Sequence, residues 1–517
     1  MQNAKCKIEI IFFILHFALC ILHSIPPLLT RGLLPLLFFL FAAIVNAQEI
    51  ELTVKISALS PQTKVHIEGL MLNSSDTGKN WSFLQNYADV TNLGERIENL
   101  KSVNGRAGQV YFKKLAPGEF EAEQAPAAFQ YDVKTAIPQQ LTAAAHVSWL
   151  SETHGLLMLG DLLPQNLQNF SAKITFELPS DWRVATSETR LSEKAFNVKN
   201  VEKAVFLIGK DWRGQAKQLE KNELNLATFG EWQFTDAEAL QIAETIFNEH
   251  RKVFGEIPFP KTQVLLLPFP QTANFERWRA ETRGATVTII SAPTTFKSAA
   301  INRLHEQLRH EIFHLWIPNS LNLSGNYDWF YEGFTLYKAL KTGVYLNQIR
   351  FDDFLSTLGR AFDLTEALSR RQSFSLLEAS QKRWINASEL IYAKGIVVAF
   401  LTDATLLRDS RGKRDLDAIF REVFQKHRAP QPKEDGNAAI LRILKSSAEL
   451  VPLVEKYIEG NSKIDWQSDL ETFGMSAEKI SGATEIKVNR KPNGRQKDLL
   501  NKLGYNQWRK LLQKDNK

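Results

Sequence analysis

The spacing of apolar residues changes once along the chain, and this change limits the folds that the chain can adopt. From residue 48 to about 225, segments such as IELTVKISAL alternate apolar and polar residues, a pattern typical of half-buried β-strands. From residue 234 to 255 the apolar residues follow helical spacing instead, with Thr235 or Asp236 as the expected cap. Nearly every segment from 345 to 457 has the same helical spacing. Strands followed by helices predict a multidomain α+β protein.

The same patterns suggest how the chain is divided. We expect an N-terminal leader, an antiparallel β domain, an α/β domain whose second half is helical from about residue 345, and a basic C-terminal tail. The predicted bounds of these four segments are 1–47, 48–225, 226–475 and 476–517.

The leader resembles an export signal. It contains two apolar runs and ends in VNA, with small residues at the positions that signal peptidases recognise, so we expect cleavage after Ala47. The protein would then be exported to a periplasmic, extracellular or envelope-associated location, with membrane contact only if the leader is retained. Both cysteines, Cys6 and Cys20, lie in the leader, so the mature chain would have neither disulfides nor thiolate metal ligands.

The composition excludes some classes of partner. The 517 residues are 44% hydrophobic and 23% charged, which is ordinary for a globular protein. The formal charge of +6 is a mild excess spread along the chain and forms no basic stripe. We therefore predict no nucleic-acid partner.

A histidine pair marks the candidate site, in the stretch RHEIFHLWIPNSLNLSGNYDWFYEGFTLY. Apolar spacing predicts a helix over residues 300–317, which places His310 and His314 one turn apart on one face. Two imidazoles in this arrangement can bind one zinc ion. Glu311 lies about 100° round the helix from His310, where it can reach a water held by the metal and act as a general base.

A catalytic zinc site needs a third protein ligand and one open position. Glu332, on the next predicted helix, is the expected third ligand of one Zn²⁺ per chain. Asp328 lies one turn before Glu332, and we expect it to act in the outer shell as an acceptor for a ligand imidazole. As an alternative, HExxH arises by chance on ordinary helices, in about one chain in a hundred of this composition. The downstream glutamate favours the metal site.

The stretch resembles the gluzincin metallopeptidases, notably the glycyl aminopeptidase family and, more distantly, the aminopeptidase N family. HEIFH followed by WFYEGF carries the resemblance, together with FGEIPFPKTQVLLLPFP, ELIYAKGIVVAFL and YIEGNSKIDWQSDLETFGM. The resemblance spans most of residues 130–475 and implies a thermolysin-like catalytic domain over 226–475. It also implies that His310, His314 and Glu332 bind zinc, that Glu311 is the base and that Tyr392 is an oxyanion donor. By itself, a tyrosine at position 392 is typical of a helix core.

The sequence departs from the aminopeptidase N pattern at two places. Seventeen residues separate His314 from Glu332, one fewer than in that family. The family also has a Gly-x-Met-Glu-Asn edge strand whose glutamate binds the substrate amino group. Its expected equivalent here is 283–288, with Gly284 and Ala285 predicted to pair with substrate and Val287 at the position of the carboxylate.

The resulting hypothesis is an exported zinc metallopeptidase of peptide or protein substrates, aminopeptidase-like in its motifs, in which Glu311 activates a zinc-bound water. The alternative is a catalytically retired binding protein of the same fold that keeps a structural zinc ion. The sequence leaves open whether cleavage is exo or endo.

Overall fold

The computed structural model describes seven stretches of the chain, and residues from Leu52 onward group as one unit. The described ranges are 52–58, 64–72, 78–88, 90–102, 110–168, 170–272 and 278–507. The predicted leader, its cleavage site after Ala47 and both cysteines lie outside the described residues.

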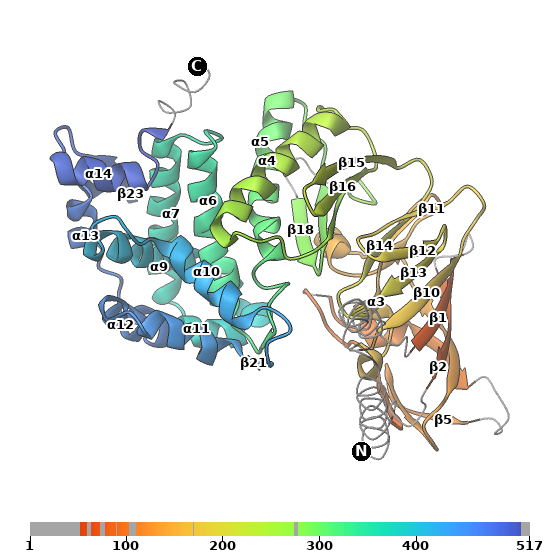
Figure 1. The fold of residues 1–517 in the computed structure, drawn as a ribbon. Helices are drawn as coiled ribbons and strands as arrows, with labels where there is room; N and C mark the ends of the chain where they lie inside the picture. The colour runs from red at the N-terminus through yellow and green to blue at the C-terminus, as the bar shows by residue number, and fades with distance from the viewer. Residues whose placement is uncertain are drawn as a thin grey trace, which may run out of the picture. The chain divides into compact units, whose positions relative to one another are not determined.

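A seven-stranded sheet forms the first layer, in the order β12-β13-β10-β1-β2-β7-β4 (Figure 1). Its pairs are antiparallel except for β1 and β10, which run parallel. The alternation predicted for the first strand is present, since Leu52, Val54 and Ile56 are fully buried while their neighbours are partly exposed. The strands are β1 (Leu52–Ser57), β2 (Lys64–Met71), β4 (Ile97–Ser102), β7 (Ala128–Lys134), β10 (Ala172–Glu177), β12 (Thr189–Ser192) and β13 (Ala195–Val198).

A four-stranded sheet, β11-β14-β9-β8, packs against this first layer, and a three-stranded sheet, β3-β6-β5, adds to the same region. The ring of Phe176 on β10 meets that of Phe206 on β14 at a centroid distance of 4.9 Å. The strands are β3 (Asn80–Ser82), β5 (Phe112–Ala116), β6 (Glu119–Ala122), β8 (Trp149–Leu150), β9 (His154–Met158), β11 (Arg183–Ala185) and β14 (Val205–Gly209). Short helical segments between them are η2 (Leu93–Arg96), η3 (Leu141–Ala145), α3 (Leu159–Leu162) and η4 (Gln165–Leu167).

A five-stranded sheet follows, in the order β15-β16-β17-β19-β18, with a parallel centre and an antiparallel strand at each edge. Its strands are β15 (Arg213–Leu219), β16 (Asn222–Thr228), β17 (Lys261–Leu267), β18 (Trp278–Arg283) and β19 (Thr286–Ser291). The first two of these strands precede or cross the predicted boundary at residue 226, so this sheet begins earlier in the chain than the change of pattern indicated.

The two faces of the five-stranded sheet pack against different layers because side chains alternate along each strand. Val264 and Leu266 face a core shared with helices α4 (Asp236–Phe254) and α5 (Lys297–Glu311). Leu265 and Leu267 face a second core shared with the four-stranded sheet. Thr235 caps α4 through a capping box, as one of the two predicted alternatives.

The rest of the described chain is mostly helical, as predicted. Its elements are η5 (Phe313–Leu315), η6 (Trp329–Phe334), α6 (Thr335–Tyr345), α7 (Phe351–Ser369), α8 (Leu376–Gln381), η7 (Arg383–Ala387), α9 (Ser388–Asp409), α10 (Leu416–His427), α11 (Gly436–Lys445), η8 (Ala448–Leu450), α12 (Val451–Leu453), η9 (Val454–Glu459) and α13 (Gln467–Thr472), with the short strands β20 (Leu323–Ser324) and β21 (Glu434–Asp435).

One helical stretch, Arg383–Asp409, is long and apolar enough to cross a membrane by length and composition. Its most apolar window is 94% buried inside the protein. Such burial is typical of a core helix, and α9 indeed packs among the surrounding helices.

The segment predicted as a basic tail is folded over most of its length. Strands β22 (Met475–Ile480) and β23 (Ala483–Val488) form a hairpin, and helix α14 (Gly494–Lys502) follows. The backbone N–H of Thr484 donates to Asp363 of α7 at 2.7 Å, which anchors the hairpin to that helix. The segment predicted as a basic C-terminal tail thus contains a hairpin and a helix over the described residues up to 507.

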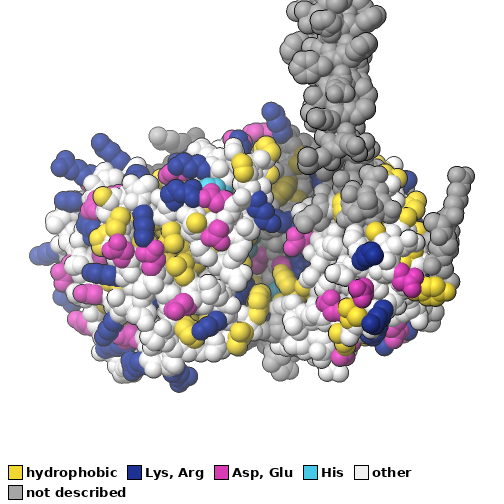
Figure 2. Space-filling view, turned by 90° about the horizontal axis from the view of Figure 1, so that it is seen from below, with side chains coloured by type: hydrophobic (Ala, Val, Ile, Leu, Met, Phe, Trp, Pro, Cys, Tyr) yellow, Lys and Arg dark blue, Asp and Glu magenta, His cyan; other side chains and the backbone are white. Residues whose placement is uncertain are grey.

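Charged side chains of both signs are mixed over the face drawn in Figure 2, where the described residues form no large patch of one sign. This distribution agrees with the small net charge of the whole sequence.

Candidate metal centre

The predicted histidine pair lies where helix α5 ends. The α-helix reaches Glu311, and a 3₁₀ turn over Phe313–Leu315 carries His314, so the regular helix is shorter than the predicted 300–317. The carbonyl oxygen of Ile317 lies 2.9 Å from Nδ1 of His314 and can accept a hydrogen bond from the N–H at that position. This contact leaves Nε2 of His314 facing Nε2 of His310 at 3.0 Å.

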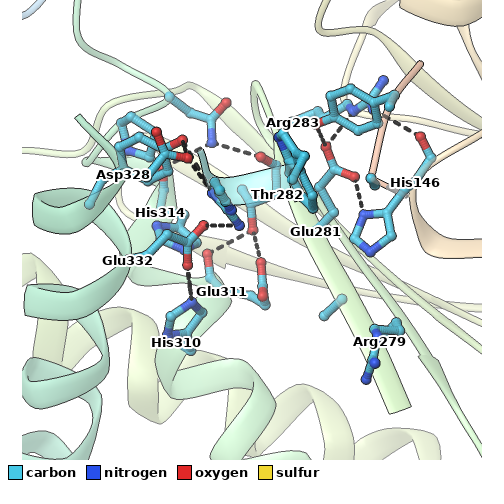
Figure 3. Close-up of a pocket in the computed structure, with 18 of the residues that line it drawn as sticks. His146, Arg279, Glu281, Thr282, Arg283, His310, Glu311, His314, Asp328 and Glu332 are labelled. Atoms are coloured by element: carbon cyan, nitrogen blue, oxygen red, sulfur yellow. Dashed lines mark hydrogen bonds and ion pairs between the residues drawn. The ribbon is translucent and has the colours of Figure 1, made fainter. Parts of the chain in front are cut away.

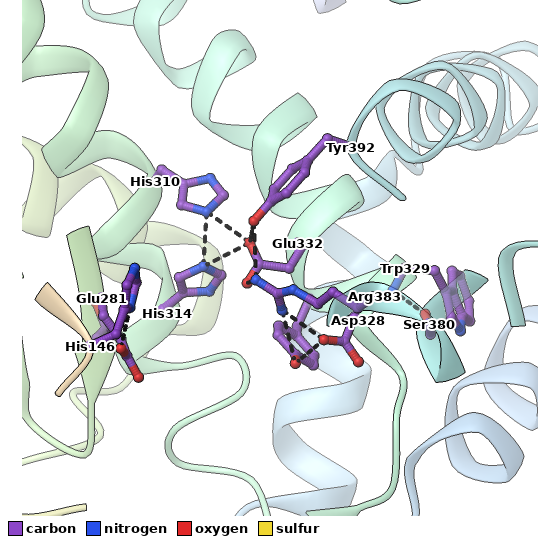
Figure 4. A network of polar contacts seen from close by, with 12 residues as sticks. His146, Glu281, His310, His314, Asp328, Trp329, Glu332, Ser380, Arg383 and Tyr392 are labelled. Atoms are coloured by element: carbon purple, nitrogen blue, oxygen red, sulfur yellow. Dashed lines mark hydrogen bonds and ion pairs between the residues drawn. The ribbon is translucent and has the colours of Figure 1, made fainter. Parts of the chain in front are cut away.

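Glu332 reaches the pair from a separate element. It lies on the π-helical segment η6, which continues into α6, and π-helical turns are frequent at functional sites. Its Oε2 lies 3.1 Å from Nε2 of His310 and 3.7 Å from Nε2 of His314 (Figure 4). The structure thus brings together the three residues predicted as metal ligands.

The geometry of the three donors fits a zinc ion. Neighbouring ligands of a tetrahedral zinc site lie about 3.3 Å apart when the bonds are about 2.0 Å long. The three donor atoms lie within 4.8 Å of one another, and two imidazoles with one carboxylate are a donor set that zinc prefers. His310, His314 and Glu332 also line a cleft of about 840 Å³, so the group is open on one side.

Arg383 holds the other oxygen of the glutamate. Its guanidinium lies 3.0 Å from Oε1 of Glu332 and also donates to Asp328 at 2.6 Å and to the hydroxyl of Tyr392 at 3.2 Å. Asp328 accepts a second bond from Tyr331. The predicted contact between Asp328 and a ligand imidazole was therefore wrong, because both of these donors to Asp328 come from other side chains. Asp328 and Glu332 are linked by Arg383, which contacts both carboxylates.

Electrostatics favour a charged Glu332. Burial alone would raise the pKa of Glu332, but the charge of Arg383 and the bonds from the two histidines hold it well below its usual range. Burial lowers the pKa of His314, whereas Glu332 more than offsets this and raises it above its ordinary value. An ionised carboxylate is the form that a metal ion requires.

Tyr392 of α9 points its hydroxyl at the same group. It donates to Oε2 of Glu332 at 3.0 Å, and the side chain lines the cleft. Burial, followed by the charge of Glu332, raises the pKa of Tyr392 above its ordinary value. The phenol therefore keeps its proton and remains a hydrogen-bond donor.

Glu311 is held beside the metal group by a residue that the sequence did not single out. The hydroxyl of Thr282 lies 2.8 Å from Oε2 of Glu311 and 2.9 Å from its carbonyl oxygen (Figure 3). Glu311 is only 5% exposed and lines the cleft. Thr282 belongs to β18, so the edge of the five-stranded sheet sets the position of this carboxylate.

The segment 283–288, expected to be the edge strand, lies mostly on the inner strand β19. The edge of the sheet is β18, whereas Val287 lies on the inner, fully buried strand β19. Gly284 and Ala285 form the turn between the two strands, outside the cleft lining, and the N–H of Gly284 donates to Asn319. The error came from the sequence WRAETR, in which polar residues conceal a strand whose polar face lines the cleft.

The edge strand β18 does carry a carboxylate. Glu281 lines the cleft and lies in a cluster with Arg283 of the same strand and with Tyr87 and His146 of the N-terminal region. The alternating polar residues of the segment between β17 and β19 were the signal that could have identified it.

Similarity to known proteins was found in the structure and not in the sequence. No model of a known protein family and no curated protein sequence matches it. An aminopeptidase N family protein from Idiomarina loihiensis superposes with a TM-score of 0.71 at 15% identity, covering 83% of this chain and 79% of that chain. A variant of the M1 zinc metallopeptidase from Deinococcus radiodurans, bound to a Tyr-Ser-Ala substrate, gives 0.52 at 12% identity over 80% of this chain and 95% of that chain.

The enzyme from Deinococcus radiodurans without that substitution gives a similar result, with a TM-score of 0.51 at 12% identity, 80% of this chain and 95% of that chain. These identities are too low to transfer a function, but the coverage extends over most of both chains. The chain therefore has the multidomain α+β fold of the aminopeptidase N and M1 zinc metallopeptidase structures, with His310, His314 and Glu332 gathered in its cleft as a possible metal group.

Proposed function

We propose that this protein is a zinc-dependent peptidase that hydrolyses peptide bonds at the group formed by His310, His314 and Glu332. The observation that carries the proposal is the combination of these three convergent donors with the carboxylate of Glu311 in one open cleft. The fold supports it, since a solved structure of the same fold has a peptide substrate bound.

Each residue has a defined task in this proposal. Zinc, when bound by the three ligands, supplies a Lewis acid that polarises the scissile carbonyl and acidifies water. Glu311 accepts a proton from the attacking water and passes it to the leaving amine. Tyr392 donates a hydrogen bond to the negative charge that develops on the carbonyl oxygen. The exposed edge of β18 can pair with an extended peptide through backbone hydrogen bonds.

The alternative, a retired binding protein with a structural zinc ion, has less support in the site. A structural zinc site is closed by a fourth protein ligand, whereas this group, among the described residues, offers three donors and faces the cleft. A protein that only binds a partner would not need a buried carboxylate next to the ligands, such as the one that Thr282 holds here.

The experiment that tests the proposal compares wild type with Glu311→Gln. Both proteins should bind one zinc per chain, measured by elemental analysis, and the variant should lose peptide hydrolysis by about 10²-fold or more. Glu249→Gln, which removes a surface carboxylate of α4 that pairs with Lys252, is the matched control. An active Glu311→Gln protein would exclude Glu311 as the base. Stoichiometric zinc without hydrolysis of a broad peptide library by wild type would favour the binding protein.

The proposed function includes export of the protein from the cytoplasm. We propose that the leader is removed after Ala47 and that the mature protein acts outside the cytoplasm, as the cleavage-site pattern predicts. N-terminal sequencing of the protein recovered from its host would show Gln48 as the first residue. An N-terminus at Met1 would contradict the cleavage.

A further inference from the structure

The polar face of β18 forms one wall of the cleft beside the metal group. Arg279, Glu281 and Arg283 alternate along this edge strand, so their side chains lie on one face of it. All three line the cleft. The charge that this wall offers to a bound peptide therefore depends on how these three side chains are paired.

Glu281 has no oxygen left without a partner. Its Oε1 accepts from Nε of Arg283 at 2.7 Å and from the hydroxyl of Tyr87 at 2.6 Å. Its Oε2 lies 2.5 Å from Nδ1 of His146 (Figure 3). Arg283 also donates to the carbonyl oxygen of His146 and lies over the ring of Tyr87. The cluster joins the edge strand to the N-terminal region of the protein.

The guanidinium cancels the charge of the carboxylate. The side chains of Glu281 and Arg283 are only 13% and 11% exposed, so solvent screens their attraction weakly. Burial raises the pKa of Glu281, but the charge of Arg283 and the bond from His146 lower it to about 2. Glu281 is thus an ionised group whose charge is already balanced inside the protein.

A free α-ammonium group would bind poorly to this wall. It would have to displace a donor from Glu281 and then lie beside the buried positive charge of Arg283, where like charges repel. Asp328, another buried carboxylate of the cleft, is paired with Arg383. The other carboxylates that line the cleft are Glu311, the metal ligand Glu332, and the exposed Glu202 and Glu306, which lie off this wall.

We propose that Arg283 determines the substrate class, an inference that rests on the proposed peptidase function. With Glu281 paired, the wall beside the metal group accepts an uncharged stretch of peptide. The protein therefore cleaves internal bonds or N-blocked peptides. The preferred substrate is then a peptide whose chain continues, or is acylated, on the amino side of the scissile bond. Free amino-terminal residues are disfavoured at this wall because Arg283 occupies the carboxylate of β18, Glu281.

The test uses two peptides of one sequence, one with a free amino group and one N-acetylated, each cleaved by the zinc-loaded protein. Products are identified by mass spectrometry and kcat/KM is measured for both. Wild type should cleave the acetylated peptide at least as efficiently as the free one. Arg283→Gln should raise the ratio of kcat/KM for the free peptide to kcat/KM for the acetylated peptide by about tenfold. A tenfold change corresponds to about 1.4 kcal/mol.

Two further variants separate this effect from a general one. Arg279→Gln removes a positive charge from the same face of β18 without touching Glu281, since its guanidinium donates to the carbonyl of Trp278. It should shift the ratio far less than Arg283→Gln does. The double variant Glu281→Gln/Arg283→Gln leaves no unpaired charge behind, which protects folding, and should return the ratio toward that of wild type. Thermal melting and zinc content show that each variant is folded.

The outcomes are distinguishable. If wild type requires a free amino group and Arg283→Gln leaves the ratio unchanged, the inference is overturned while the peptidase function stands. If wild type with bound zinc cleaves neither peptide nor any member of a broad peptide library, the proposed function fails and the inference falls with it. A ratio that changes equally in Arg279→Gln and Arg283→Gln would also overturn the inference, because the pairing with Glu281 would then be irrelevant.

Discussion

Arg383 contacts Oε1 of Glu332 at 3.0 Å, while Oε2 of the same carboxylate lies 3.1 Å from Nε2 of His310. One oxygen of Glu332 is therefore engaged by a fixed guanidinium and the other is directed at the two imidazoles. Arg383 also contacts Tyr392, so one largely buried side chain orients the proposed third ligand and the proposed oxyanion donor together.

We expect Arg383→Gln to weaken zinc binding and catalysis together. Loss of the guanidinium frees the carboxylate of Glu332 to rotate, and outer-shell changes of this kind typically cost about 10- to 100-fold in metal affinity or activity. Zinc affinity is measured by competition with a chromogenic chelator, and kcat in zinc-saturated buffer. Arg350→Gln, which removes an exposed arginine that pairs with Asp353, is the matched control. Unchanged zinc affinity in Arg383→Gln would contradict the positioning role.

Thr282→Val should lower kcat and leave zinc binding intact. The hydroxyl of Thr282 contacts Oε2 and the carbonyl oxygen of Glu311, and a hydrogen bond to a charged group contributes about 1.5–3 kcal/mol. Valine has the same shape without the hydroxyl, so we expect about a tenfold or larger fall in kcat with little change in KM. Thr282→Ser restores the hydroxyl and should recover most of the activity. Equal activity of the valine and serine variants would rule out this hydrogen bond as the cause.

The crossing of η6 and α9 depends on two glycines that come into direct contact. A Cβ built on Gly333 would lie 2.6 Å from Cα of Gly395, and one on Gly395 would lie 2.6 Å from Cα of Gly333. Either alanine forces apart the elements that carry Glu332 and Tyr392. Gly333→Ala and Gly395→Ala should each lower the free energy of unfolding by about 1–3 kcal/mol, as overpacking does.

Chemical denaturation measures the loss of unfolding free energy in the two alanine variants. Their zinc affinity should also fall, because the elements that carry Glu332 and Tyr392 move apart. Gly494→Ala is the matched control, since a Cβ at this position in the first turn of α14 meets no atom within 4 Å. That variant should be neutral or slightly stabilising. A Gly395→Ala protein as stable as Gly494→Ala would show that the two elements can separate without cost.

Stability should fall as pH drops from 7 to 5, in part through His250. Burial, with a smaller effect of the charge of Lys338, lowers the pKa of His250 from 6.5 to about 3. The unfolded chain therefore binds a proton below pH 6.5 that the native state does not, so stability is full above 6.5 and is lost on acidification toward pH 3. The linkage relation gives a loss of about 2 kcal/mol between pH 7 and pH 5.

His250→Gln tests this assignment, because glutamine can keep the donor that faces the carbonyl oxygen of Arg309. The free energy of unfolding, measured in urea at both pH values, should depend less on pH in the variant than in wild type. An identical pH dependence in the two proteins would remove His250 from the explanation.

The fold was predicted from the sequence wherever spacing along the chain decides structure. The strand–helix order and the helical half from about residue 345 are present, and the two histidines face each other at the end of α5. The edge strand was misplaced because WRAETR is mostly polar: its alternation is carried by Arg279, Glu281 and Arg283, which line a cleft, and not by large apolar residues. Asp328 was assigned to an imidazole because spacing shows which residues are neighbours on a helix, but not which distant side chain reaches them.

The sequence by itself predicted the histidine pair and the proposed base, because His310, Glu311 and His314 follow one another along one short helical stretch. Only the tertiary structure decided which groups act on them. Thr282 meets Glu311 across 29 residues of chain, Arg383 meets Asp328 across 55, and His146 meets Glu281 across 135. Contacts of this range are set by how buried layers pack against one another, and no local spacing of residues encodes that packing.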